Sequence, residues 1–257
     1  MSTILVTGGT GALGKLVVER LRASDHEVRV LSRRPRAGTH LGDLMTGVGV
    51  SEAARGAELI VHAASDTQRF GRSDPQQTAH LLEAARGARH LLYVSIVGID
   101  EIPFAYYRRK LSCEQLVASS GIPHTILRAT QFHQLLAWLL RSAERLPVAP
   151  LPLDFRFQTC AAADAADRVA EVIGAEPAGG IVNFGGPEVL TLRQMAAAWS
   201  AARGRPRRTL RLPLPGAVAR AFREGRNTCP DQASHGQRWE EFVAAGPDVP
   251  YTVRVAP

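Results

Sequence analysis

Lysine is almost absent from this chain: it occurs only at positions 15 and 110, whereas the sequence has 29 arginines and a formal net charge of +7. The densest basic run, from Arg203 to Arg211, has no aromatic residues between its arginines, and no DNA-binding motif accompanies it. We therefore expect this run to be a solvent-exposed edge of the protein rather than a nucleic-acid site, and we expect no nucleic-acid partner.

Cysteine is also scarce, and long apolar runs are missing. Cys113, Cys160 and Cys229 lie far apart, which excludes the usual spacings of metal sites and gives no reason to expect a disulfide. No hydrophobic run approaches the length of a membrane helix. The chain starts directly in a strand-like pattern, without a basic and apolar leader, so we expect a cytoplasmic protein with no membrane partner and no metal.

The sequence does contain one organising stretch, which runs from Val6 to Gly14. It follows the apolar run Ile4–Val6 and opens a helical pattern, and this order of strand, glycine-rich turn and helix is typical of a dinucleotide-binding site. Glycines at positions 8, 11 and 14 permit a tight turn, a close approach to a pyrophosphate and close packing of helix on strand. The cofactor-binding residues expected here are Gly8, Thr10, Gly11, Ala12, Leu13 and Gly14.

This turn has two other interpretations. Gly9 to Lys15 matches the start of a phosphate-binding P-loop, but Leu16 stands where that loop needs Ser or Thr to hold Mg²⁺. A glycine turn without any ligand is the second alternative.

Strand-like and helical segments alternate along the first half of the chain. This alternation predicts an α/β fold, a Rossmann-type doubly wound parallel sheet. The pattern weakens after Arg128, where helical segments and one strand at residues 181–184 follow. We therefore expect an NAD(P)-binding region at residues 1–130 and a smaller substrate-binding cap at residues 131–257, packed together as one unit.

The end of the second expected strand, Glu27–Leu31, indicates which cofactor is bound. An acidic residue there would bind the adenosine ribose of NAD(H), whereas arginine accepts the 2′-phosphate of NADP(H). The chain has Ser32, Arg33 and Arg34 at this point and no acid. This favours NADP(H) over NAD(H). The fourth expected strand, Leu59–Ala64, ends in the small residues Ala63 and Ala64, where the dinucleotide should cross the strand ends.

Tyr106 and Lys110 form the candidate catalytic pair. They stand four residues apart in a helical segment and so share one face. A tyrosine hydroxyl protonates a carbonyl oxygen as hydride arrives, and a nearby ammonium lowers the pKa of the phenol from its usual value of about 10. Ser95, at the end of the fifth strand, completes the candidate catalytic set. A surface lysine beside a core tyrosine, and a serine that only caps a turn, are the structural alternatives.

These blocks together resemble the atypical short-chain dehydrogenases/reductases of the NmrA-like, NAD(P)-binding group. The resemblance covers about residues 1–200 and rests on the first glycine turn, Gly42-Asp43-Leu44, Val94–Gly98, Tyr106–Lys110 and Leu127–His133. It implies that Lys110 also contacts the nicotinamide ribose and that Asp43 and Leu44 lie against the adenine. It further implies that Thr130, Gln131 and Phe132 lie near the nicotinamide. Ser95 stands only eleven residues before Tyr106, a shorter interval than in typical extended reductases.

Two functions of different classes follow. The first is an NADP(H)-dependent oxidoreductase that transfers hydride between the nicotinamide and a carbonyl, enone or imine of a small metabolite. The second is a non-catalytic redox sensor that acts through a protein partner, because members of the group are known to bind the cofactor without turning it over. We expect a monomer or a homodimer.

Overall fold

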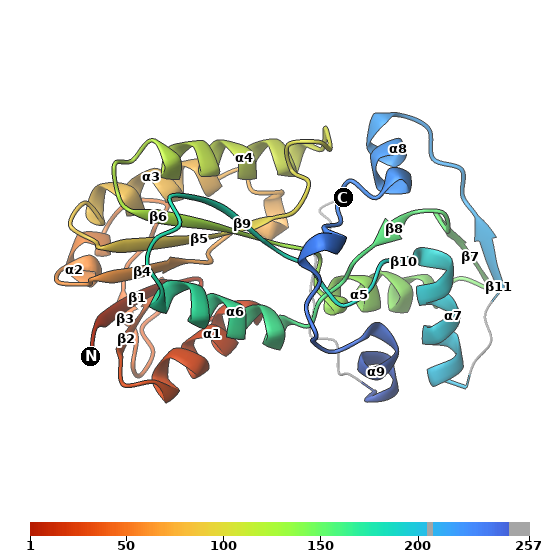
Figure 1. The fold of residues 1–257 in the computed structure, drawn as a ribbon, viewed down its shortest axis with the longest axis horizontal. Coiled ribbons are helices and arrows are strands. Elements are labelled where there is room, and N and C mark those ends of the chain that lie inside the picture. Colours follow the sequence, from red (N-terminus) through yellow and green to blue (C-terminus); the bar gives the residue numbers. More distant parts are fainter. Residues whose placement is uncertain (205–207, 247–257) are drawn as a thin grey trace.

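The computed structural model describes residues 1–204 and 208–246 and is built on a seven-stranded sheet (Figure 1). The strand order is β3-β2-β1-β4-β5-β6-β9, and all neighbouring strands run parallel. The strands are β1 (Thr3–Thr7), β2 (Glu27–Ser32), β3 (His40–Leu41), β4 (Leu59–His62), β5 (His90–Ile96), β6 (His124–Ala129) and β9 (Gly180–Phe184).

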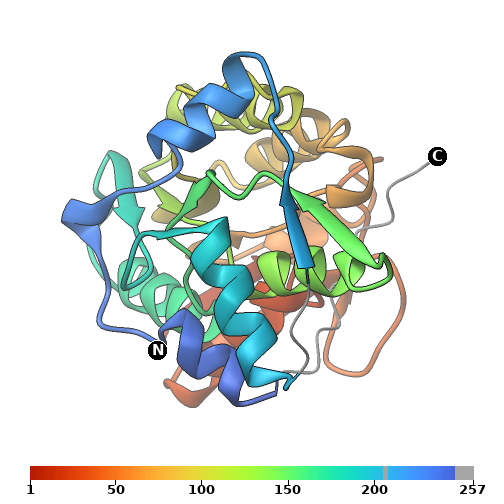
Figure 2. The same ribbon diagram turned by 90° about the vertical axis from the view of Figure 1, so that its right-hand side faces the viewer.

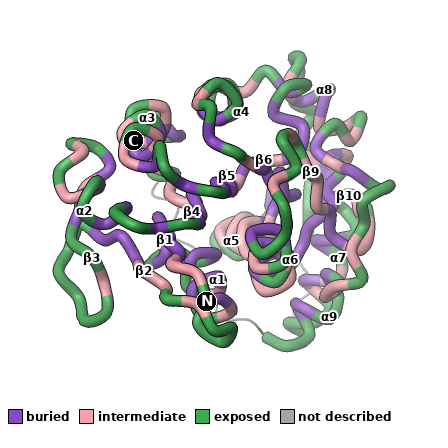
Figure 3. The backbone as a smooth tube through the Cα atoms, turned by 60° about the vertical axis from the view of Figure 1, so that its left-hand side comes forward, coloured by how far each residue is buried: buried purple, intermediate pink, exposed green. Residues whose placement is uncertain are grey.

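The central strands are buried because their sequences are nearly continuous apolar runs. β4 is buried throughout, and four of the five residues of β1 are buried. Parallel strands covered on both faces need this composition, because neither face meets water. Figure 3 shows these buried strands at the centre of the molecule, with exposed chain around them.

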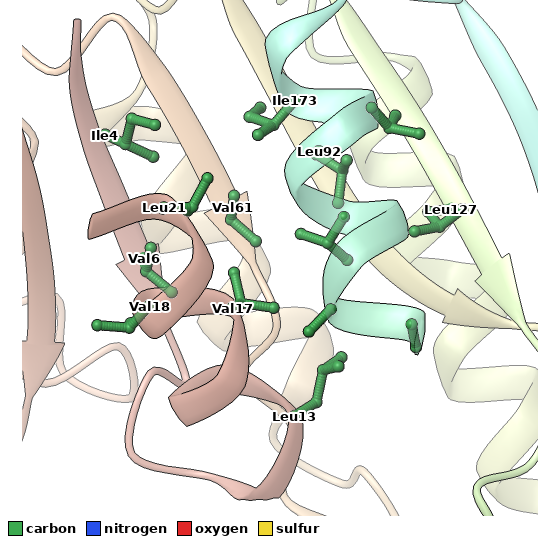
Figure 4. Close-up of a cluster of buried hydrophobic side chains, with 14 of the residues drawn as sticks. Ile4, Val6, Leu13, Val17, Val18, Leu21, Val61, Leu92, Leu127 and Ile173 are labelled. Carbon is green, nitrogen blue, oxygen red and sulfur yellow. The ribbon is translucent and has the colours of Figure 1, made fainter. Parts of the chain in front are cut away.

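Helices cover both faces of the sheet. α1 (Ala12–Ala23) and α6 (Ala162–Gly174) pack side by side on one face, where their apolar side chains meet those of β1, β4, β5 and β6 (Figure 4). The short α2 (Val50–Ala54), α3 (Asp74–Ala84) and α4 (Ala105–Ala118) cover the opposite face. The expected α/β, Rossmann-type doubly wound sheet is thereby confirmed.

A smaller region lies beyond one end of the sheet and has its own apolar core (Figures 1 and 2). Its two small sheets pair β10 with β8 and β11 with β7. Its elements are α5 (His133–Ala143), β7 (Val148–Leu151), β8 (Arg156–Phe157), β10 (Leu190–Thr191), α7 (Leu192–Ala202), β11 (Arg208–Arg211), α8 (Ala217–Glu224) and α9 (Trp239–Ala244). Two short 3₁₀ helices, η1 (Thr67–Arg69) and η2 (Pro230–Gln232), lie in loops.

The expected boundary at residue 130 needs correction. Residues 162–184 form α6 and β9, which return to the large sheet, where β9 pairs with β6. α6 goes back because its buried side chains, including Val169 and Ile173, complete the apolar layer that α1 covers only in part. The chain therefore leaves the Rossmann region after β6, re-enters it with α6 and leaves it again after β9.

Within residues 1–204 and 208–246, no helix has the length and apolar character needed to cross a membrane. The same residues contain no group of three or more His, Cys, Asp or Glu side chains arranged to hold a metal ion.

One buried histidine makes stability depend on pH. The His62 ring is fully buried between the hydroxyls of Thr7 and Thr78, with ring nitrogen to oxygen distances of 2.7 Å and 3.0 Å. Burial, aided by the charge of Lys110, lowers the pKa of His62 to about 3. An unfolded histidine has a pKa of about 6.5, so below that value the unfolded chain binds a proton that the folded chain does not.

We therefore expect the stabilisation to be complete above about pH 6.5 and to be lost as the pH falls from there toward 3. Between about pH 7.5 and about pH 5 the loss due to His62 is about 2 kcal/mol. Urea unfolding at the two pH values should show this loss in the natural chain but not in a His62→Gln variant. Equal losses in both proteins would contradict the assignment to His62.

Candidate functional site

The candidate site lies at the edge of the sheet where the carboxyl ends of the parallel strands meet. Open α/β sheets bind ligands at this edge, where the strand order reverses. Here the reversal falls between β1 and β4, because β1 is followed in space by β2 on one side and β4 on the other. The glycine turn after β1, the Ala63–Ala64 segment after β4 and the end of β5 therefore share one edge.

The glycine turn has the geometry that a pyrophosphate requires. Gly8 has φ +73°, and a Cβ there would lie 2.6 Å from the backbone nitrogen of Ala64. A Cβ on Gly14 would overlap the carbonyl oxygen of Gly8, so only glycine lets α1 start this close to β1. Gly11 is different: its Cβ would meet only the Gly8 oxygen, at 3.2 Å.

The start of α1 is exposed and carries no side-chain cap. Gly11 is the N-cap residue and has no side chain with which to cap the first turn. Thr10, Gly11 and Ala12 are exposed, whereas Leu13 belongs to the buried core. The uncapped N–H groups and the positive end of the helix dipole suit a phosphate, so the turn fits the dinucleotide expected from the sequence.

The loop after β2 presents two exposed arginines, Arg33 and Arg34. The Ser32 hydroxyl is engaged within the same turn, since it donates to the Arg34 carbonyl at 2.8 Å and accepts from the Arg34 N–H at 3.2 Å. Ser32 thus shapes the loop, and the guanidinium groups are left as the candidate ligands for a 2′-phosphate.

Asp43 and Leu44 point in different directions. The Asp43 carboxylate accepts a hydrogen bond from the Met45 N–H at 2.9 Å and so holds its own turn. Leu44 is 7% exposed, and its side chain joins the core under α2 and α3. The adenine contact that the resemblance implies for Asp43 and Leu44 stays a prediction, and at Leu44 the side chain is turned into the core.

Tyr106 lies in the first turn of α4 and is partly exposed. Its hydroxyl lies 3.1 Å from the Ser65 hydroxyl, in the loop that follows Ala63 and Ala64. Ser65 in turn donates to a carboxylate oxygen of Asp74 at 2.6 Å. The structure thus brings Tyr106 to the carboxyl end of β4, beside the position expected for the dinucleotide.

Lys110 is 3% exposed and lies against β5. Its Nζ donates to the Val94 carbonyl at 2.9 Å and sits 4.2 Å from the centre of the Tyr93 ring. Burial lowers the pKa of Lys110, while the negative charges of Asp74 and Glu114 oppose that shift. This is a buried lysine rather than the surface lysine of the structural alternative.

Ser95 is 3% exposed, and its hydroxyl has no hydrogen-bond partner among the described residues. Side chains alternate along a strand, so Ser95 shares a face with Tyr93, which is the face that α4 covers. An unsatisfied buried hydroxyl is rare. Ser95 follows Val94, whose carbonyl accepts from Lys110, and this position suits a group that binds a substrate oxygen.

The segment after β6 is tied to the smaller region. Thr130 accepts a hydrogen bond from the Gly186 N–H at 3.2 Å, and Phe132 packs at the edge of the core beneath α1 and α6. Gln131 donates to the Tyr107 hydroxyl at 3.1 Å and accepts from the fully buried Asn227 at 3.2 Å. These contacts place Gln131 where α4, β6 and the loop after α8 meet.

Sequence reasoning missed Ser65, Asp74 and Asn227. A signal for Asp74 was present, because Ser73-Asp74-Pro75 has the acidic residue and the proline that favour a helix start. In the structure α3 begins at Asp74. No local pattern points to Asn227, which reaches the site only through the folding of the C-terminal region.

The glycines of the turn give a prediction that separates fold from binding. Gly14→Ala forces a Cβ into the Gly8 carbonyl and should destabilise the protein by roughly 1–3 kcal/mol. Gly11→Val meets little protein and should keep the natural melting temperature, yet lose NADPH binding because its side chain occupies the place of the pyrophosphate. Thermal unfolding and calorimetric titration with NADPH measure the two effects. Full NADPH affinity in Gly11→Val would refute the site.

Arg33 supplies a prediction on cofactor choice. Arg33→Ala should weaken NADPH binding by about ten- to over a hundredfold, because a charge-assisted hydrogen bond contributes roughly 1.5–3 kcal/mol, and should spare NADH. Calorimetry with both cofactors makes the comparison. Equal weakening of both would mean that Arg33 holds the loop or the adenine rather than the 2′-phosphate.

Comparison with protein families and solved structures agrees with this geometry. Residues 8–135 match a family described as NAD(P)H-binding. The fold is shared with an NADPH complex of a quinone oxidoreductase from Escherichia coli, with a TM-score of 0.80 and 20% identity over 94% of this chain and 99% of that one. It is also shared with triphenylmethane reductase from Citrobacter sp. bound to NADP(H), with a TM-score of 0.69 and 19% identity over 96% and 89% of the two chains.

Two relatives are also similar to this chain in sequence. A (4-alkanoyl-5-oxo-2,5-dihydrofuran-3-yl)methyl phosphate reductase from Streptomyces griseus is 34% identical over 225 residues, which cover 80% of this chain and 75% of that protein. Quinone oxidoreductase 2 of Escherichia coli is 26% identical over 209 residues, which cover 76% and 72% of the two chains. With this level of identity and a shared fold, the chain belongs to the NAD(P)H-binding family, which agrees with its resemblance to the atypical, NmrA-like group of short-chain dehydrogenases/reductases.

Proposed function

We propose that this protein is an NADPH-dependent reductase that acts on a carbonyl, enone or imine of a small metabolite. The observation that carries the proposal is the position of Tyr106 and Lys110, a partly exposed phenol and a buried amine on one helix, at the strand ends beside the glycine turn. A protein that only bound the cofactor would need no proton donor at this edge.

The chain's own groups have distinct parts in this reaction. NADPH, when bound, supplies the hydride. Tyr106 supplies a proton to the substrate atom that gains negative charge, and the unsatisfied Ser95 hydroxyl holds a substrate oxygen in place. The Lys110 ammonium has three protons, of which one is donated to the Val94 carbonyl, so it retains donors for the ribose and offsets the charge left on Tyr106.

The relatives favour conjugated acceptors within this substrate class. Reductases and quinone oxidoreductases recur among them, which supports an oxidoreductase in general. The oxo-dihydrofuran named for the Streptomyces griseus relative carries an alkanoyl group beside a ring carbonyl. We infer that an electron-poor double bond conjugated to a carbonyl is the first class to screen.

A redox sensor is the second candidate. Its support is the contact between the smaller region and the site, since α8 residues such as Ala221 pack against Ile102 and Tyr107 near the start of α4. A change of cofactor state at the strand ends would reach the C-terminal surface through this contact. In that case NADP(H) binds tightly and no substrate is reduced.

Tyr106→Phe distinguishes the two functions because it removes one oxygen and keeps the ring. Turnover, followed by NADPH oxidation on an enone found by screening, should fall by roughly 10²–10⁴, while NADPH affinity stays unchanged. Lys110→Met keeps the buried stem but removes the amine, and should lower both turnover and NADPH affinity.

Undiminished turnover in Tyr106→Phe would refute the proton-donor role. Tight NADPH binding without turnover of any carbonyl, enone or imine by the natural chain would instead support the sensor.

A further inference from the structure

A chain of three polar groups connects the candidate proton donor to a buried acid. The hydroxyl of Tyr106 lies 3.1 Å from that of Ser65, and Ser65 donates to Asp74 Oδ2 at 2.6 Å. Asp74 is 2% exposed and stands at the first position of α3, on a different element from both other groups. These hydrogen bonds thus join α4, the loop after β4 and α3.

The hydrogen positions in this chain follow from its chemistry. A serine hydroxyl has one proton, and a carboxylate only accepts. Because Ser65 gives its proton to Asp74, its oxygen is left as the acceptor toward Tyr106. Tyr106 must therefore be the donor in its contact with Ser65, which requires that the phenol keeps its proton.

The Asp74 carboxylate accepts hydrogen bonds at both of its oxygens, one of them from Ser65. Its other oxygen accepts from the Asp66 N–H at 2.7 Å, and the residue lies at the positive end of the α3 dipole. The negative charge of Asp74 in turn favours the protonated form of Lys110. Asp74 thus has hydrogen-bond donors at both oxygens without Tyr106. The direction of donation therefore runs from Tyr106 to Ser65 and from Ser65 to Asp74.

We propose that Asp74 is a positioning residue that acts through Ser65 to hold the Tyr106 hydroxyl in its protonated, donating form. This inference rests on the proposed function, in which Tyr106 gives a proton to the substrate. Asp74 disfavours the phenolate before the proton is transferred, and Lys110 stabilises the phenolate that remains afterwards. The pair of opposite buried charges sets Tyr106 as an acid, which suits a reductase rather than an enzyme that works in the oxidative direction.

The ionisable groups around Tyr106 come from several elements. Besides Asp74 of α3 and Lys110 of α4, Tyr93 of β5 and the adjacent Tyr107 lie near its ring. From α8, the apolar side chains of Val218 and Phe222 belong to the same hydrophobic cluster as Tyr106. Burial raises the pKa of Tyr107 to about 12 and that of Tyr93 well above its usual value, so both titrate above the ordinary range of a phenol.

The test titrates Tyr106 in the cofactor-free protein by its tyrosinate ultraviolet absorbance. Subtracting the curve of Tyr106→Phe isolates this residue. Asp74→Asn keeps the shape of the side chain but provides an amide that donates to Ser65, which can then donate to the phenolate. We expect the Tyr106 midpoint to fall by about one pH unit, a tenfold change in proton affinity. An unchanged midpoint would overturn the proposal.

Two further variants show whether the effect passes through Ser65. Asp66→Asn makes the same chemical change at a nearby carboxylate that binds Ser73 rather than Ser65, and should leave the midpoint unchanged. In a Ser65→Ala background, Asp74→Asn should shift the midpoint by less than about threefold in proton affinity, because the connection is cut. A full shift in either protein would overturn the proposal in favour of a general charge or stability effect.

Turnover provides a separate readout. In Asp74→Asn the loss of reductase activity at high pH should begin about one unit lower, while the affinity for NADPH stays the same. If no substrate is ever reduced, the proposed function fails, yet the titration still decides whether Asp74 controls the proton of Tyr106. If turnover is found but its pH profile does not move with the titration, the link from Asp74 to the reaction is refuted.

Discussion

The close contact between the backbones of Gly8 and Gly14 is the constraint on which the rest of the structure depends. It lets α1 begin directly over the end of β1, and any side chain at position 14 would strike the Gly8 carbonyl. Because α1 starts there, its first N–H groups lie at the carboxyl edge of the sheet, where the strand order reverses between β1 and β4. The same contact therefore fixes the packing of the first helix and opens the place for a phosphate.

Charged side chains are buried beneath α3 and α4, on the side of the sheet that carries Tyr106. Lys110 and Asp74 lie there with few exposed atoms, and the fully buried His62 stays neutral between two threonines. Burying opposite charges close together costs less than burying either alone. This polar layer reaches from the glycine turn, through Thr7, to the helix that carries Tyr106.

The smaller C-terminal region is joined to this layer by buried contacts. Ile99 and Ile102, between β5 and α4, pack with Ala221 of α8, and Gly98 leaves no room for a Cβ against the backbone of Arg226. Asn227 and Gln131 extend the connection to Tyr107. The two regions therefore share one interior beside the proposed reacting groups, and changes on one side can alter the geometry on the other.

The sequence by itself determined the dinucleotide turn, the parallel doubly wound sheet and the Tyr106–Lys110 pair, because each depends on short spacings within a strand, a turn or a helix. Only the tertiary structure decided that β9 returns to the large sheet, that Leu44 faces the core and that Asp74 reaches Tyr106 through Ser65. These features join segments that lie tens of residues apart. Their contacts are set by how the helices pack on the sheet, which the local pattern of apolar and polar residues does not specify.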